Sequence, residues 1–351
     1  MNEWYRLKSV GLTDSNIKAL LKVTKEYDEI FSIRNEQFCL YLNFDESTIK
    51  KIQDSKNINL EAELKKLNDH KIKVIFIEDE EYPEKLKNTA NPPLFLFCKG
   101  NIELLKNFSI GVVGTRKATS YGKVACENFT SGLVEEGITT VSGLALGIDT
   151  ICHKKTLLKN GNTIAVVGSG LDIIYPKENK NVWEEIETRG LLISEYPLGT
   201  QPQIYHFPMR NRIIAGLSKG ILIIESREKG GSLITANIAL DEGRDIFAIP
   251  GEIFSDFSAG CNNLIKNSQA KLVSKVEDIL EEYGIKSNNK EKIQLNELEQ
   301  LIYDTLTTSK TLDDILIEVN EKAPEVLATL IELEIKGLVT ATLGGCYMRK
   351  K

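Results

Sequence analysis

The pattern of hydrophobic positions is most regular between residues 109 and 249, where short apolar runs alternate with stretches of helical periodicity. Six of these runs are predicted to be strands: Ser109–Val113, Thr139–Val141, Thr163–Val167, Leu191–Ser194, Gly220–Ile224 and Asp245–Ile249. Strands that are apolar on both faces and joined by helices indicate a parallel sheet buried on both sides. The handedness of such crossovers predicts an extended, Rossmann-like, doubly wound α/β fold.

The residues before this region carry shorter periodic patterns. They predict helices and then two β-rich runs: Arg6–Val10, Thr13–Val23, Asp28–Ile33, Glu36–Leu42 and Asp45–Lys56 as helices, Lys73–Ile77 and Leu94–Cys98 as strands. A helix, a glycine turn at Gly11 and a second helix are typical of helix-hairpin-helix modules that approach DNA. Because this hairpin carries few basic residues, a small helical bundle used for packing or dimerisation is the favoured interpretation.

The last residues predict a separate small domain. Three amphipathic helices are expected over Leu295–Leu306, Thr311–Val319 and Ala323–Ile335, followed by a β-hairpin over Gly337–Met348. Three helices and a hairpin resemble a winged helix, whose third helix would enter DNA. Here that helix carries Glu325, Glu332 and Glu334 against Lys322 and Lys336. A role in protein contacts or packing is therefore favoured for it.

Charge and glycine divide the chain in the same places. The predicted domains are residues 1–70 (helical, of the SAM or helix-hairpin-helix type), 71–282 (Rossmann-like), 283–294 (linker) and 295–351 (winged-helix-like). The net charge of -6 comes from -2 in residues 1–104, zero in 105–280 and -4 in 281–351. Nineteen of the 25 glycines fall between residues 111 and 260. Such crowding marks loops that approach a ligand closely.

Composition excludes several classes of protein. No apolar run is long enough to cross a membrane and the first residues do not form a signal peptide, so the expectation is a cytoplasmic protein with free thiols. The six cysteines lie at least 26 residues apart, which excludes zinc spacing. Neither a P-loop motif nor a G-x-G-x-x-G fingerprint is present. We therefore expect neither a metal nor a cofactor.

Glycine- and hydroxyl-rich turns follow several of the predicted strands. The carboxyl ends of parallel strands share one edge of the sheet, and this edge is where such folds bind ligands. Exposed backbone amides before a helix favour a phosphate. The candidate phosphate-binding residues in these turns are Gly114, Thr115, Arg116, Ser142, Gly143, Gly168, Gly230, Gly231, Ser232 and Thr235.

A further candidate segment runs from Phe207 to Ser218. Pro208 is expected to begin a helix, with Arg210, Asn211 and Arg212 in its first turn. Cations there oppose the helix dipole, so they need an anionic partner. The partner could be internal, Glu195 or Glu225, or it could be a ligand. Rings at positions 196, 205, 206 and 207, interleaved with cations, favour single-stranded nucleic acid, with Phe207 stacking on a base.

Five segments taken together resemble one known family. They are G-T-R-x-x-x-x-Y-G (114–122), S-G-L-A-L-G-I-D (142–149), G-S-G-L-D-x-x-Y-P-x-E-N (168–179), F-P-M-R-N-R-I-I-A-G-L-S (207–218) and G-G-S-L-I-T-A (230–236). In this order they are similar to the DNA-processing protein A family, also called DprA or Smf. The resemblance implies a non-enzymatic, homodimeric protein that binds single-stranded DNA without sequence preference. It also implies that the protein protects incoming DNA and loads the RecA recombinase during natural transformation.

A second hypothesis is a nucleotide-processing enzyme of the phosphoribohydrolase type, which uses a related glycine-rich fold. Such enzymes usually pair a P-G-G-x-G-T loop with a catalytic Glu. The segment Lys229–Thr235 lacks the proline and the third glycine of that loop, although Glu225 could serve as an acid.

Overall fold

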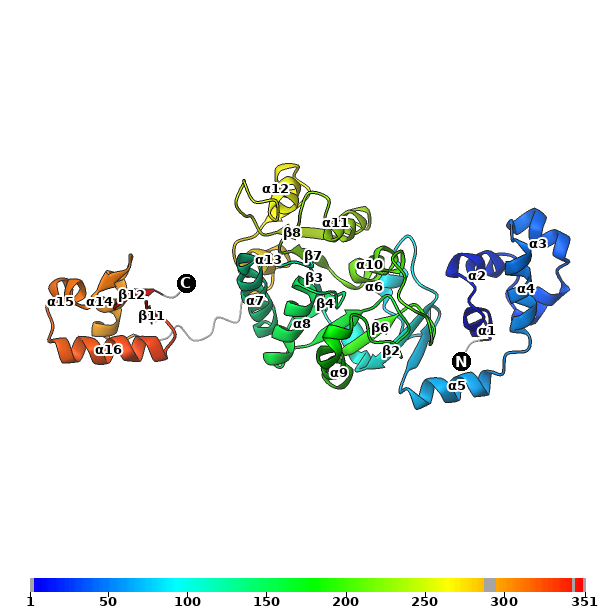
Figure 1. The fold of residues 1–351 in the computed structure, drawn as a ribbon, viewed down its shortest axis with the longest axis horizontal. Helices are drawn as coiled ribbons and strands as arrows, with labels where there is room; N and C mark the ends of the chain where they lie inside the picture. Colours follow the sequence, from blue (N-terminus) through cyan, green and yellow to red (C-terminus); the bar gives the residue numbers. More distant parts are fainter. Residues whose placement is uncertain (1–2, 287–294, 343–344, 350–351) are drawn as a thin grey trace. The chain divides into compact units, whose positions relative to one another are not determined.

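The structure, a computed structural model, describes residues 3–286, 295–342 and 345–349. The chain divides after Lys286 into two compact units, of which the larger comes first (Figure 1). The predicted linker over residues 283–294 lies mostly outside the described residues. Its first part belongs to the larger unit, because the Tyr283 ring packs edge-on against Phe108, with 5.0 Å between ring centroids.

A nine-stranded sheet forms the centre of the larger unit. Its strands are β1 (Lys73–Phe76), β2 (Phe95–Gly100), β3 (Ser109–Val113), β4 (Thr139–Ser142), β5 (Thr163–Val166), β6 (Leu191–Ser194), β7 (Gly220–Ile223), β8 (Asp245–Ala248) and β9 (Lys271–Leu272). They lie in the order β1-β2-β6-β5-β4-β3-β7-β8-β9. The six strands predicted for the Rossmann-like region are all present. The two-residue strand β9 was not predicted, because so short a segment carries no pattern.

The sheet is parallel from β6 to β9, whereas β2 runs antiparallel to both of its neighbours, β1 and β6. The prediction of a parallel sheet, made for the six strands between residues 109 and 249, is therefore correct, and the two predicted strands before them form an antiparallel edge. Only parallel pairs need a crossover helix, and the connection from β1 to β2 holds just the four-residue helix α6 (Glu84–Lys87). A short connection of this kind suits an antiparallel pair.

Helices cover both faces of the sheet, as expected for a doubly wound fold (Figure 1). One face packs against α7 (Ser120–Glu135), α8 (Ile148–Leu158), α9 (Lys180–Arg189) and α13 (Glu277–Glu282). The other packs against α6, α10 (His206–Leu217), α11 (Gly231–Asp241) and α12 (Ala259–Lys266). Side chains of β3 show the alternation: Val112 packs with the first group of helices and Val113 with the second.

Helix α10 begins at His206, two residues before the predicted start at Pro208. Proline is tolerated there because the first amides of a helix have no intrahelical acceptor. The shift places Arg210 as the fifth residue of the helix rather than in its first turn. The position of its side chain is therefore set by packing more than by the helix end.

The N-terminal helices pack onto the antiparallel edge of the sheet. They are α1 (Tyr5–Ser9), α2 (Asp14–Leu21), the 3-10 helix η1 (Tyr27–Ser32), α3 (Asn35–Leu42), α4 (Glu46–Ser55) and α5 (Leu60–Asp69). All except α5 match predicted helices, and Thr13 accepts a bond from the Asn16 amide as the cap of α2. Tyr5 joins these helices to the sheet through ring contacts with Phe95 and Phe97, at 5.9 and 6.1 Å. A SAM or helix-hairpin-helix identity remains a prediction.

The smaller unit contains α14 (Glu297–Thr305), α15 (Leu312–Val319) and α16 (Ala323–Ile335), close to the three predicted helices. A sheet of β10 (Lys310–Thr311), β12 (Cys346–Arg349) and β11 (Val339–Ala341) accompanies them, in that order. The hairpin was predicted but β10 was not, and residues 343–344 of the hairpin lie outside the described part. The winged-helix assignment stays a prediction.

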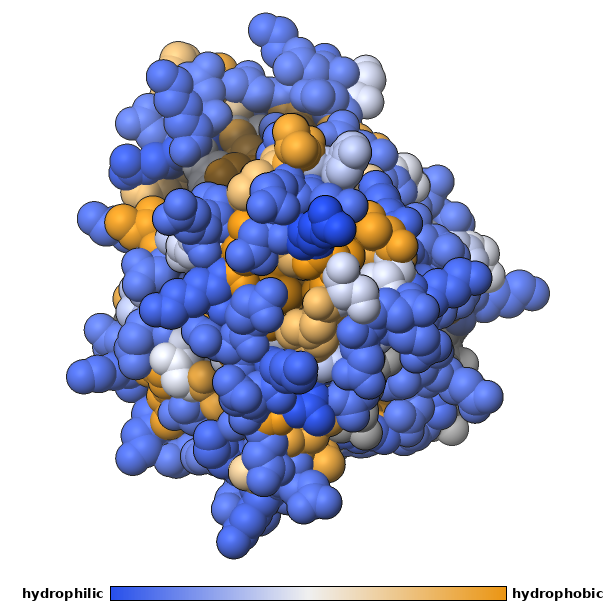
Figure 2. Space-filling view, turned by 90° about the vertical axis from the view of Figure 1, so that its right-hand side faces the viewer, coloured by the Kyte–Doolittle hydropathy of each residue, from blue (hydrophilic) through white to orange (hydrophobic). Residues whose placement is uncertain are grey.

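The surface over the N-terminal helices is mainly hydrophilic, with several apolar patches among the polar side chains (Figure 2). Within the described residues, no helix is both long and apolar enough to span a membrane.

The aromatic contact between the N-terminal helices and the sheet provides a stability test. Phe97 is fully buried, so Phe97→Ala should lower the free energy of unfolding of the larger unit by about 3–5 kcal/mol. Phe254, which is 96% exposed, provides the matched control, and Phe254→Ala should stay within about 0.5 kcal/mol of wild type. Urea unfolding measures both. Equal effects of the two substitutions would contradict the packing described.

Candidate nucleic-acid interface

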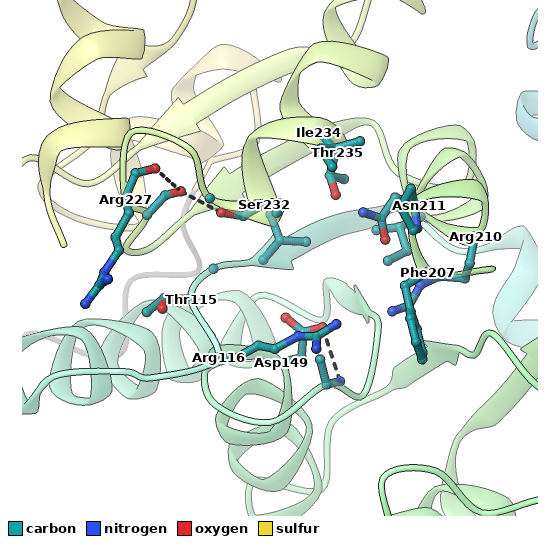
Figure 3. A pocket seen from close by; sticks show the side chains of 18 of the residues that line it. Thr115, Arg116, Asp149, Phe207, Arg210, Asn211, Arg227, Ser232, Ile234 and Thr235 are labelled. Atoms are coloured by element: carbon teal, nitrogen blue, oxygen red, sulfur yellow. Dashed lines mark hydrogen bonds between the residues drawn. The ribbon is translucent and has the colours of Figure 1, made fainter. Parts of the chain in front are cut away.

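The carboxyl ends of β3 and β7 lie side by side at the point where the strand order reverses. After β3 the chain continues to β4 on one side, while β7 and β8 extend the sheet on the other. The helices that follow, α7 and α11, lie on opposite faces, so a crevice opens between their first residues. A cavity of about 490 Å³ occupies this place (Figure 3).

Most of the predicted site residues meet at this cavity. Those that line it are Gly114, Thr115, Arg116, Phe207, Arg210, Asn211, Gly230, Gly231, Ser232 and Thr235. Two more, Gly143 and Gly168, line a small adjoining hollow that shares Arg116, Phe207 and Arg210 with the cavity. Residues from four separate loops and helices are thus brought together at one edge of the sheet.

Ser142 and Arg212 do not line the cavity, contrary to the prediction. The Ser142 hydroxyl is buried and donates to the Val112 carbonyl at 2.7 Å. Arg212 forms an ion pair with Glu195 and donates to the Asn91 carbonyl at 2.6 Å. Two residues along a helix differ by about 200° around its axis, so Arg210 and Arg212 point to opposite sides. The internal salt bridge with Glu195 is therefore the correct interpretation of Arg212.

Two amides of the loop before α8, including that of the predicted site residue Gly143, already have an internal acceptor, which also differs from expectation. The Gly143 and Ala145 amides donate to one carboxylate oxygen of Asp149, at 3.1 and 3.3 Å. In contrast, α11 begins at Gly231 beside the cavity, and its first two amides, those of Gly231 and Ser232, have no acceptor within the helix, whereas the Leu233 amide donates to the Gly230 carbonyl at 3.1 Å. A Cβ at Gly231 would meet nothing within 4 Å. The start of α11 is thus the open amide-rich part of the site.

Arg210 forms a buried positive floor of the cavity. Its side chain donates to the carbonyl oxygens of Gly143 and Val166, and the residue is only 4% exposed. A Cβ at Gly143 would lie 2.5 Å from the guanidinium, so a larger residue there would push the buried Arg210 side chain aside. Burial lowers the pKa of Arg210 to about 10, an effect opposed by the nearby Asp149 carboxylate. The group is therefore charged at neutral pH.

Aromatic rings form one wall of the cavity. The Arg116 guanidinium lies over the Phe207 ring, 5.5 Å from its centroid. Tyr175 stacks on the Phe207 ring, with 5.5 Å between ring centroids and 30° between ring planes. Arg116 and Tyr175 are both exposed. An exposed cation and a pair of rings are thus held together at the mouth of the cavity.

Tyr175, Arg227 and Lys229 were not predicted as site residues. Arg227 and Lys229 are exposed in the loop after β7, just as Arg116 follows β3, so their position beyond a strand end could have revealed them. Four basic residues and one acidic residue, the buried Asp149, line the cavity among the described residues. The site is therefore electropositive although the chain is acidic.

The family model that describes DNA recombination-mediator protein A matches residues 73–284. The chain belongs to this family. The matched stretch contains the sheet, its covering helices and every residue of the cavity.

Relatives from this family are similar over most of their length. DNA processing protein DprA of Streptococcus pneumoniae is 39% identical over 292 residues, which cover 80% of this chain and 97% of that protein. Its X-ray structure covers 80% of this chain and 98% of that one, with a TM-score of 0.69. The Bacillus subtilis DprA is 44% identical over 212 residues, 60% of this chain and 71% of that protein. These matches confirm the α/β fold and a role in DNA processing and recombination.

A second solved relative is described in connection with DNA itself. It is DNA processing protein A of Helicobacter pylori, whose structure gives insight into a single-stranded DNA binding mode of that protein. That structure is 30% identical and covers 60% of this chain and 95% of that one, with a TM-score of 0.56.

Glu225, the candidate acid of the enzymatic hypothesis, is buried outside the cavity. It is 2% exposed, and its carboxylate accepts bonds from the Thr119 amide at 3.0 Å and the Thr119 hydroxyl at 2.7 Å. These bonds hold the start of α7, and Glu225 does not line the cavity. Among the residues that the structure describes, no three His, Cys, Asp or Glu side chains are grouped to hold a metal ion. The absence of catalysis, metal and cofactor stays a prediction.

A buried hydroxyl network lies behind the cavity. His153 Nδ1 is 2.7 Å from the Thr163 hydroxyl, which also bonds Thr140 at 2.8 Å. Burial, and to a smaller extent the Arg210 charge, lower the pKa of His153 to about 3. The imidazole is therefore neutral in the folded protein over most of the acidic range.

This neutral histidine predicts a pH dependence of stability. In the unfolded chain the imidazole binds a proton below about pH 6.5, whereas in the folded chain it does so only near pH 3. The contribution to stability is complete above the unfolded pKa and falls by about 1.4 kcal/mol per pH unit as the pH drops through this window. His153→Gln should remove that slope between pH 6 and pH 5. His70→Gln, at an exposed position, should leave it unchanged; parallel stability curves for wild type and H153Q would refute this.

Proposed function

We propose that the protein binds single-stranded DNA, without sequence preference, in the cavity at the ends of β3 and β7. The observation that carries the proposal is the arrangement of Arg116 over Phe207 beside the open start of α11. Phosphates pair with exposed cations and helix amides, while bases stack on rings. The single-stranded DNA binding described for the H. pylori relative supports the same ligand.

The kinds of side chain in the cavity support binding without sequence preference. Arg116, Arg227 and Lys229 are exposed and carry their charge to the mouth of the cavity. Phe207 and Tyr175 offer ring faces, and every base has a face that can stack on them. Since cations and rings contact features common to all nucleotides, the affinity follows strand length and salt rather than sequence.

We extend the proposal to the role of the protein in the cell. Bound DNA is protected and passed to the RecA recombinase during natural transformation, and the protein acts as a homodimer in the cytoplasm without catalysis. Support comes from the family, whose description is that of a mediator of DNA recombination.

Arg116→Ala tests the proposal directly. Removing one cation that pairs with phosphate should weaken binding to oligonucleotides of every sequence and reduce the slope of log affinity against log salt by about 0.7. Fluorescence anisotropy with single- and double-stranded oligonucleotides at several salt concentrations measures both quantities. The same variant should lose any stimulation of RecA assembly on single strands. Arg34→Ala, another exposed arginine outside the cavity, is the matched control; equal affinities and slopes for the two variants would refute the proposal.

A substitution at the start of α11 separates binding from stability. Because Gly231 faces open space, Gly231→Asp should fold, and its carboxylate should stabilise the helix by about 0.3–1 kcal/mol. The same charge should repel phosphate and weaken DNA binding. Gly231→Asn, nearly identical in shape but neutral, is the control. If the Asp variant binds DNA as well as the Asn variant does, the start of α11 is not part of the interface.

A further inference from the structure

A second, larger hollow lies on the opposite side of the first turn of α10. Its volume is about 820 Å³, and it runs between this turn and the N-terminal helices α1 and α2. Lys18, Lys22 and Val23 line it from the α2 side, and Tyr196, Tyr205 and Met209 line it from the other. We refer to it as the α2–α10 groove. The function proposed above does not use it.

The α2–α10 groove carries more positive than negative charge. Four of its charged side chains form two ion pairs, in which one positive and one negative charge cancel: Lys8 with Asp14 at 2.6 Å, and Arg212 with Glu195. Two lysines then remain. Lys18 donates to neutral oxygens, the Asn91 side chain at 2.8 Å and the Pro92 carbonyl at 2.7 Å. Lys22 is exposed and forms no ion pair with any residue that the structure describes.

Aromatic rings lie on both sides of the first turn of α10, one set facing the cavity at the ends of β3 and β7 and the other facing the α2–α10 groove. On the cavity side lie Phe207 and Tyr175. On the groove side, His206 stacks on Tyr196 with 3.9 Å between centroids, and Tyr205 meets the edge of His206 at 4.6 Å. Tyr205 is 66% exposed, so a face of its ring is open to solvent. Consecutive residues of one helix turn therefore present rings to both hollows.

We infer that a single strand bound in the cavity continues over the first turn of α10 into the α2–α10 groove. Tyr205 stacks on a base there, and Lys18 and Lys22 attract phosphates. A single strand carries phosphates that fit the two unpaired lysines and bases that fit the exposed Tyr205 ring. The groove lies just across the first turn of α10 from the cavity, so the same strand can reach both. The inference rests on the proposed function, because it describes a longer path for the same ligand.

A length series tests this path. Affinities of the full-length protein for oligothymidylates of about 4 to about 16 nucleotides, the range of site sizes in single-strand binding modules, show where added nucleotides stop contributing. The double variant Tyr205→Ala/Lys22→Ala removes two exposed side chains, so folding should not suffer. It should bind the shortest ligands as wild type does and the longest about tenfold more weakly. Tyr41→Ala/Lys154→Ala, also two exposed residues, is the control and should follow wild type.

The outcomes separate this inference from the proposed function. Loss of binding to all lengths in Arg116→Ala, together with a shortened site in the Tyr205/Lys22 variant, supports both. If wild type binds single strands but the two double variants show the same length dependence, the groove is not part of the path and the cavity proposal stands. Ultraviolet cross-linking of iodouracil-containing strands gives a direct check. Cross-links, assigned to single residues, should reach Tyr205 with long strands, and their confinement to Tyr175 and Phe207 would overturn the inference.

Discussion

A buried guanidinium holds the carboxyl edge of the sheet together. Arg210 reaches from α10 to the carbonyl oxygens at the ends of β4 and β5, and removing a charge from water is costly unless hydrogen bonds replace the solvent. The carbonyl of Gly143 must therefore stay in place, and Asp149 fixes the same loop by accepting two of its amides. The loop then positions α8, whose first amide bonds to the Thr115 carbonyl. The loop that carries Arg116 thus depends on Arg210.

The local charge of the cavity is opposite in sign to the net charge of the chain. The chain as a whole is acidic, and residues 281–351 account for -4 of the net -6. The cavity nevertheless collects four basic side chains from three separate segments. Because phosphate is attracted by the local potential, the total charge says little about the ligand. The negative total reflects mainly the smaller unit, whose helix α16 is rich in glutamate.

The sequence alone predicted the strands of the Rossmann-like region and the edge at which the site lies, because all-apolar runs and the turns after them leave a clear pattern. It could not separate Arg210 from Arg212. Both flank Asn211, and only the packing of α10 decides which one faces the cavity and which meets Glu195. Tyr175 was missed for a similar reason: its contact with Phe207 joins segments more than thirty residues apart. The strand β2 was predicted but its antiparallel direction was not, because pairing direction depends on the connections rather than on the hydrophobicity of the strand.

The fit of Arg210 against Gly143 also limits which amino-acid substitutions this region accepts. Any side chain at position 143 would displace the guanidinium, and loss of the guanidinium would leave two carbonyl oxygens and Asp149 without it. Neither residue can be replaced alone without disturbing the loop that both support. Although they stand 67 positions apart in the sequence, this glycine and this arginine therefore act as one structural unit.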